Sequence, residues 1–115
     1  MNVYEEAHNL ARSIKESNEF IEFDEARRSI ESDPELRDMI SEFQKAQIRM
    51  QTRMMNGEQT GNDLMQQVQS MYIMLQGKPE AVKYIERQAR FSIMMKDVYE
   101  ILSDAIGIKA EDFGL

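Results

Sequence analysis

The residues best suited to chemistry are Glu5 and His8, because His8 is the only histidine in the 115-residue chain. On a helix their spacing makes a Glu-x-x-His step on one face, which carboxylate-bridged di-iron bundles use as part of their metal-binding set. Such a set needs two steps of this kind and two further glutamates, so a second copy of the chain would have to complete it by symmetry. A metal-binding helical bundle is therefore an alternative interpretation. A partly exposed histidine with no metal is the one we adopt.

Other catalytic arrangements are not found in the sequence. The chain contains no cysteine, which excludes a disulfide framework, a thiolate metal site and a cysteine nucleophile. It has no glycine-rich phosphate loop and no nucleophile elbow. Asp112-Phe113-Gly114 matches a kinase tripeptide, but the other kinase elements are missing. The sequence therefore predicts a protein that is not an enzyme, with no cofactor and no small-molecule substrate.

The charge of the chain disfavours direct binding to nucleic acid. The net charge is −7, whereas phosphate binding needs clustered lysines and arginines. Residues 1–33 carry nine acids and four bases, so this is the acidic end of the chain, where any basic partner is expected to bind. The longest apolar run, at 71–75, is far shorter than the roughly 20 residues of a membrane span. With no secretory leader after Met1, this pattern favours a cytoplasmic protein that does not enter a membrane.

Helix start and stop signals divide the chain. Asp33-Pro34 is typical of a helix start, Asn56-Gly57 of a helix end, and Gly77-Lys78-Pro79 of a break between two helices. Apolar residues recur between these signals at steps of three and four, and no stretch alternates with the period of a strand. We therefore predict an all-α fold, with one domain over 1–115 arranged as an elongated five-helix bundle. Its predicted helices are 2–16, 19–31, 34–55, 61–76 and 79–106, of which 34–55 and 79–106 are the long ones, and 107–115 is a partly ordered tail.

The helix predicted over 79–106 is too long for one small globule to cover. Its 28 residues would span about 42 Å. A compact chain of this size has a radius of gyration of only about 13–14 Å. Residues 83–90 of this helix carry three bases and one acid, and residues 96–104 carry one base and three acids, so two antiparallel copies would place opposite charges side by side. We therefore predict a homodimer whose interface includes Tyr84, Phe91, Met95, Val98 and Leu102, with Phe91 and Met95 near its centre.

Methionine is frequent in this chain, at ten of 115 residues. Its unbranched side chain fills irregular cores, and it is also over-used on surfaces that accept several partners. Core packing is the simpler interpretation, and a partner-binding surface is the alternative.

The chain also resembles a known family. The pattern runs from an N-terminal helix through Asp33-Pro34-Glu35-Leu36 to a late, methionine-rich helix. The other residues that carry it are Tyr4, Ala7, Leu10, Ser17, Phe20, Phe43, Gln47, Met50, Gln51, Gly57, Glu58, Phe91 and Met94. Over residues 2–106 this pattern is similar to the YlbF/YmcA/YheA family of small bacterial all-helical proteins, and closest to its YheA branch.

The resemblance implies a helical homodimer with a regulatory or adaptor role that acts through other regulatory proteins. Members of the YlbF and YmcA branches join a third protein in a complex that modulates an mRNA-processing endoribonuclease. Those branches hold an iron–sulfur cluster through cysteines near the C-terminus. This chain has no cysteine, so the resemblance implies no such cluster here.

Overall fold

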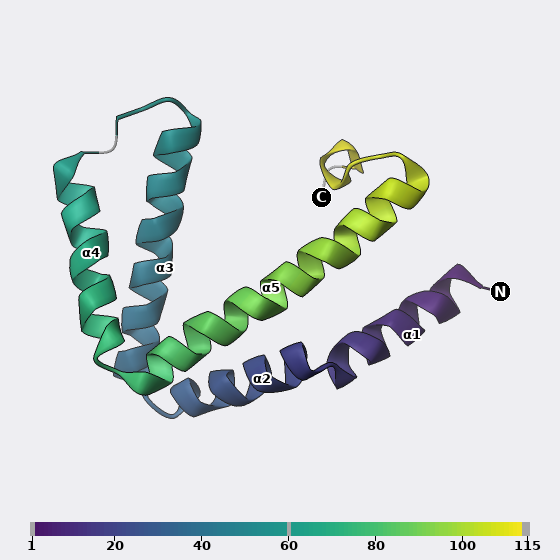
Figure 1. Cartoon of the computed structure of the whole chain (residues 1–115), viewed down its shortest axis with the longest axis horizontal. Helices are drawn as coiled ribbons and strands as arrows, with labels where there is room; N and C mark the ends of the chain where they lie inside the picture. The colour runs from purple at the N-terminus through teal and green to yellow at the C-terminus, as the bar shows by residue number, and fades with distance from the viewer. Residues whose placement is uncertain (1, 60, 114–115) are drawn as a thin grey trace. The chain divides into compact units, whose positions relative to one another are not determined.

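The computed structural model of the chain describes residues 2–59 and 61–113, and this part is all-helical, with no strand (Figure 1). Each predicted helix is present, and each of its ends lies within one residue of the predicted position. The all-α prediction is therefore confirmed. A short 3₁₀ turn, η1, follows in the predicted tail. The observed elements are α1 (Val3–Glu16), α2 (Asn18–Glu31), α3 (Pro34–Met55), α4 (Asn62–Gln76), α5 (Pro79–Ile106) and η1 (Ala110–Phe113).

Local chemistry explains where the helices begin and end. Asp33 caps α3, because its Oδ1 accepts a hydrogen bond from the Leu36 N–H at 3.1 Å. Pro34 stands at the first helical position, where no N–H donor is needed. Ser17 separates α1 from α2, and its hydroxyl accepts a hydrogen bond from the Phe20 N–H at 3.2 Å. Gly107, with φ of +70°, follows α5 in the left-handed conformation that favours glycine.

The chain forms two compact units. The central unit holds residues 26–85, and the terminal unit holds the segments before residue 26 and after residue 85. Both α2 and α5 contribute to each unit. This division does not test the prediction of one domain over 1–115, which stays a prediction, as does partial order in the tail.

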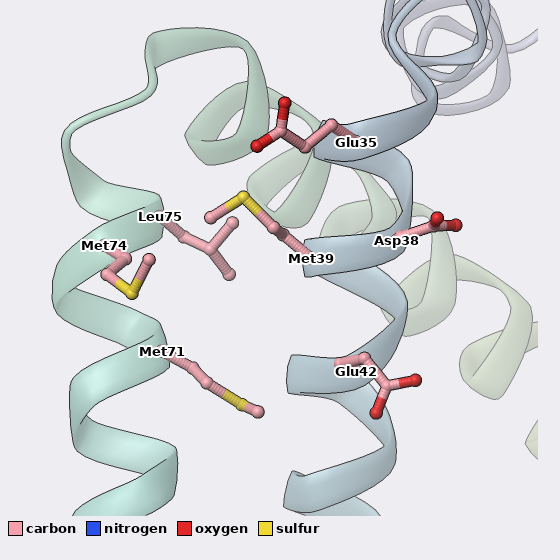
Figure 2. Close-up of a pocket in the computed structure, with 7 residues that line it drawn as sticks. All are labelled: Glu35, Asp38, Met39, Glu42, Met71, Met74 and Leu75. Atoms are coloured by element: carbon pink, nitrogen blue, oxygen red, sulfur yellow. The ribbon is translucent and has the colours of Figure 1, made fainter.

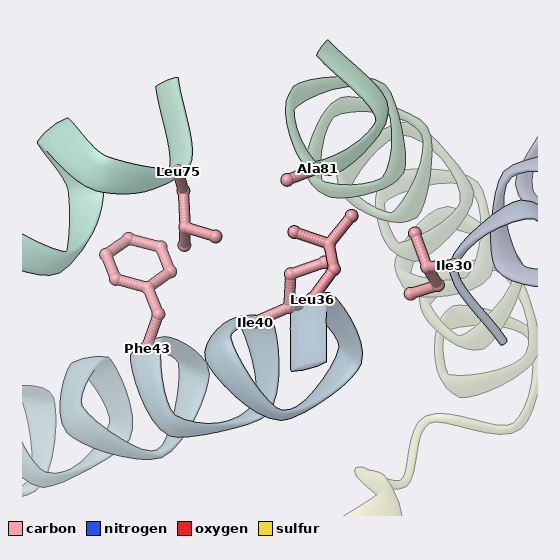
Figure 3. Packing of buried hydrophobic residues seen from close by; sticks show 6 residues of the cluster. All are labelled: Ile30, Leu36, Ile40, Phe43, Leu75 and Ala81. Atoms are coloured by element: carbon pink, nitrogen blue, oxygen red, sulfur yellow. The ribbon is translucent and has the colours of Figure 1, made fainter. Parts of the chain in front are cut away.

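The central unit contains the hydrophobic core. In it α3 and α4 lie side by side and antiparallel (Figure 1). The rings of Phe43 and Tyr72 stack across this pair with their centroids 6.0 Å apart. The end of α2 and the start of α5 complete the core (Figure 3), whose buried cluster consists of Ile30, Leu36, Ile40, Phe43, Leu75 and Ala81.

The terminal unit differs from the central unit in its burial. It consists of α1, the first part of α2, the last part of α5 and η1. Among the described side chains, every one that the structure buries belongs to residues 26–85. The apolar side chains that are described in the terminal unit are therefore at best half-buried. In the part of the chain that is described, no helix is both long enough and apolar enough to cross a membrane.

Candidate interaction surfaces

The five predicted interface residues fall in both units. Tyr84 lies in the central unit, where it is half-buried and packs against the core cluster. Burial raises the pKa of the Tyr84 phenol above its ordinary value of 10.0, while the Arg27 guanidinium lowers this pKa and the Glu31 carboxylate raises it. Phe91, Met95, Val98 and Leu102 lie in the terminal unit. The predicted interface as a set stays a prediction, but the Tyr84 side chain already packs against residues of its own chain.

The raised pKa of Tyr84 predicts a loss of stability in alkali. Above pH about 10 the unfolded chain releases the phenol proton first, so the free energy of unfolding falls as the pH rises towards the folded-state pKa. Tyr84→Phe should make this fall shallower. Urea unfolding at several pH values between about pH 9 and pH 11 measures the slope of the free energy of unfolding against pH. Tyr99→Phe, which changes an exposed tyrosine on the same helix, should retain the wild-type slope. Equal slopes for all three proteins would contradict the assignment.

Phe91 is the centre of a ring cluster within its own chain. Its ring stacks on Phe23, with centroids 5.3 Å apart and an interplanar angle of 8°. Phe20 meets the same ring edge to face at 5.6 Å. Such pairs contribute about 0.5–1.5 kcal/mol beyond the area they bury. Phe91 therefore joins α5 to α2 in the terminal unit, and its ring is covered in part before any second copy arrives.

Arg90 uses its charge within the chain as well. Its guanidinium pairs with the Glu22 carboxylate at 3.1 Å and with the Glu86 carboxylate at 2.9 Å. All three side chains are substantially exposed, so these pairs are worth only a few tenths of a kcal/mol each to stability. They do show that one of the bases of α5 already has acidic partners in its own subunit.

An apolar groove lies between α1 and the end of α5 in the terminal unit. Its volume is about 390 Å³, and α1 contributes most of its lining. Val3 is 81 % exposed and Leu102 is 48 % exposed. We call it the terminal groove, and its lining residues are Asn2, Val3, Glu6, Ala7, Leu10 and Leu102.

A second groove lies between α3 and α4 in the central unit, with a volume of about 380 Å³. From α3 it is lined by Met39 and by three acids, Glu35, Asp38 and Glu42. From α4 it is lined by Met71, Met74 and Leu75 (Figure 2). We call it the methionine groove. Sequence reasoning missed it, although the methionine content was a signal, because helical spacing alone does not show that the methionines of α3 and α4 face one another.

Glu5 and His8 are exposed on α1. Among the described residues, no group of three or more histidines, cysteines, aspartates or glutamates lies close enough to hold a metal ion. The alternative metal site needs a second copy of the chain, so it stays a prediction.

The fold defines the class of this chain: a small protein, all-helical in its described residues, with an antiparallel helix hairpin formed by α3 and α4. The chain belongs to the family described as "Control of competence regulator ComK, YlbF/YmcA", whose model matches residues 3–107. The predicted family is therefore confirmed, and the closer resemblance to the YheA branch stays a prediction.

Relatives match along nearly the whole chain. A UPF0342 protein of Caldicellulosiruptor saccharolyticus is 31% identical over 99% of this chain and 95% of its own length. A UPF0342 protein of Caldicellulosiruptor bescii is 33% identical over 98% and 95%. A solved structure from Bacillus stearothermophilus, titled a protein of unknown function (DUF964), matches with a TM-score of 0.70. It is 19% identical over 91% of this chain and 92% of that one, so the likeness concerns the fold.

Proposed function

We propose that this protein is a homodimeric, non-enzymatic interaction module that regulates other proteins by binding them. The description of its family, "Control of competence regulator ComK, YlbF/YmcA", supports the regulatory part of this proposal. More specifically, we propose that the protein acts as an adaptor in the regulation of mRNA processing, a role that the family resemblance implies.

One observation carries the dimer: the terminal unit has helices but no buried side chain among its described residues. Helices of this length are marginal in water unless an apolar face is packed. The apolar face of α1, which includes Val3, Ala7 and Leu10, is exposed along the terminal groove. Soluble monomers rarely leave such faces open, and a two-fold pair of identical chains is the commonest way to cover them. The occupant that we propose for the terminal groove is therefore a second copy of this chain.

The proposed interface retains part of the interface predicted from sequence. Leu102, Val98 and Met95 remain at least partly exposed on α5 and are available to a second copy. Val3 and Leu10 of α1 join them through the terminal groove. Tyr84 and Phe91 contribute mainly by packing inside their own subunit.

The oligomeric state tests the proposal. Sedimentation equilibrium at micromolar concentration should give twice the 13.5 kDa mass of the chain. The melting temperature should also rise with protein concentration, because association stabilises the folded state by mass action. A monomer that unfolds cooperatively at a concentration-independent temperature would overturn the dimer.

The regulatory role has a separate test. Deleting the gene should change the pattern of mRNA ends in the native cell, and returning the wild-type chain should restore it. An unchanged pattern would overturn the adaptor role and leave the dimer standing.

The order of charges on α5 predicts an antiparallel arrangement of the two long helices. Arg87 stands in the basic part of α5 and Glu100 in the acidic part. Arg87→Glu should raise the dimer dissociation constant several-fold, and Glu100→Lys in the same chain should lower it again. Arg90 is unsuitable for this exchange, because its reversal would also break ion pairs within the subunit. Sedimentation velocity gives both constants, and a failed rescue would argue for a parallel or crossed arrangement.

A further inference from the structure

We propose that the methionine groove binds an amphipathic helix of a partner protein, with apolar side chains seated in the groove and lysines or arginines beside the acids of α3. This inference rests on the proposed interaction function and names its partner class. The groove belongs to the central unit, whereas the proposed dimer surface belongs to the terminal unit.

The apolar part of the groove suits side chains of varied shape. Leu75 is 1 % exposed and belongs to the buried core cluster, so it forms a fixed floor. Met39 and Met71 are half-buried and point into the space between α3 and α4 (Figure 2). Met74 is 60 % exposed at the α4 side. Methionine is flexible and polarisable, so three methionines over a rigid floor can adapt to the side chains of an incoming helix.

The charge of the groove has one sign. Glu35, Asp38 and Glu42 follow one another on α3 at steps of three and four residues, so they form a row roughly 10 Å long. None of the residues that line the groove is basic. Residues 62–76, which form α4, contain one acid and no base. A helix bearing lysines or arginines at matching steps would complement this row, and an acidic helix would be repelled.

The acids of the groove remain available to a partner. Asp38 has an ion pair with Arg37 at 3.8 Å, and Glu42 has one with Lys45 at 3.7 Å. The side chains in these two pairs are 54–75 % exposed, so the pairs are weak and a base from a partner can replace them. The Glu35 carboxylate lies above Met39 at one end of the groove (Figure 2).

The choice of occupant follows from shape and charge together. An apolar groove between two antiparallel helices matches the way amphipathic helices are bound, with anchors at i, i+3, i+4 and i+7. Nucleic acid and anionic lipid would bring further negative charge to an acidic row on a chain of net charge −7. A basic amphipathic helix is the occupant that satisfies both the apolar floor and the acidic row.

A model peptide tests the proposal directly. The probe is a fluorescent helical peptide with leucines at i, i+3, i+4 and i+7 and lysines flanking them. Anisotropy titrations with the wild-type protein should give saturable binding that weakens as salt is added. The same peptide with glutamate in place of lysine should bind at least about tenfold more weakly, and a scrambled peptide that lacks an apolar face should do the same.

Two charge-reversed proteins locate the site. Glu35→Lys, Asp38→Lys and Glu42→Lys together should weaken binding of the lysine peptide by about tenfold or more. The matched control reverses Glu58, Asp63 and Glu80, which are exposed acids of the central unit outside the groove, and it has the same net charge. Equal weakening in both proteins would mean attraction by overall charge alone, which would overturn the groove.

Methyl NMR adds a readout of position. Bound peptide should shift the ε-methyl signals of Met39, Met71 and Met74 and leave those of Met54 and Met55, which are exposed outside the groove. Absence of binding to a protein that sediments as a dimer would overturn this inference and leave the proposed dimer intact. Peptide binding with the expected methyl shifts to a monomeric chain would support the groove and overturn the dimer.

Discussion

Replacing Leu102 by glutamate should convert the dimer into a monomer. In the free chain the Leu102 side chain is 48 % exposed beside α1, so glutamate there costs little within one subunit. In the proposed interface the carboxylate would be buried without a partner, which costs several kcal/mol. Light scattering at micromolar concentration should therefore give the mass of one chain.

The monomer should also lose helix in the terminal unit. That unit has no buried side chain of its own among the residues described, so α1, which lies outside the ring cluster of Phe20, Phe23 and Phe91, depends on the second copy for an apolar environment. Circular dichroism of Leu102→Glu should show a partial loss of helical signal. Tyrosine packing around Tyr84 in the central unit should persist, as judged by near-ultraviolet dichroism.

The matched control is Ile48→Glu. Ile48 is 61 % exposed on α3 in the central unit, outside the terminal groove, and receives the same charge. This variant should stay a dimer with full helical signal. A dimeric Leu102→Glu protein would contradict the proposed surface. Phe91→Asp is a poorer test, because it would also break the ring cluster with Phe20 and Phe23.

Replacing Phe43 by alanine should lower the free energy of unfolding by about 3–5 kcal/mol. Phe43 is almost fully buried in the core cluster and its ring stacks on Tyr72 of α4, so alanine leaves a cavity between α3 and α4. Small proteins of this size have a total stability of about 5–15 kcal/mol, so the loss is a large fraction of it. Urea unfolding followed by circular dichroism measures the change.

Two further variants test whether the lost core packing causes the loss of stability in Phe43→Ala. Phe43→Leu keeps most of the buried volume and should cost clearly less than Phe43→Ala. Ile48→Ala, on the exposed face of the same helix, should change stability by no more than about 0.5 kcal/mol. Similar losses at Phe43 and Ile48 would mean that α3 is not packed as the core cluster indicates.

The helices were determined by the sequence alone, because their signals are local. A cap such as Asp33 acts on a backbone N–H three residues away, and Pro34 fixes its own φ. Leu36, Ile40 and Phe43 recur in the sequence at steps of four and three, which places them on one face of α3, and all three are buried in the structure. The family could be identified from the sequence for the same reason, since its pattern consists of helix caps, helix breaks and apolar spacing.

Tertiary structure alone decided which surface covers each apolar face. The period of α5 places Tyr84 and Phe91 on one seam, but it does not say that Tyr84 packs on the core or that Phe91 stacks on Phe23. Likewise, the methionines of α3 and α4 form a groove because two helices meet side by side. Helical periodicity fixes the direction of a side chain relative to its own axis, whereas its neighbours depend on long-range packing that apolar residues drive without specifying a partner.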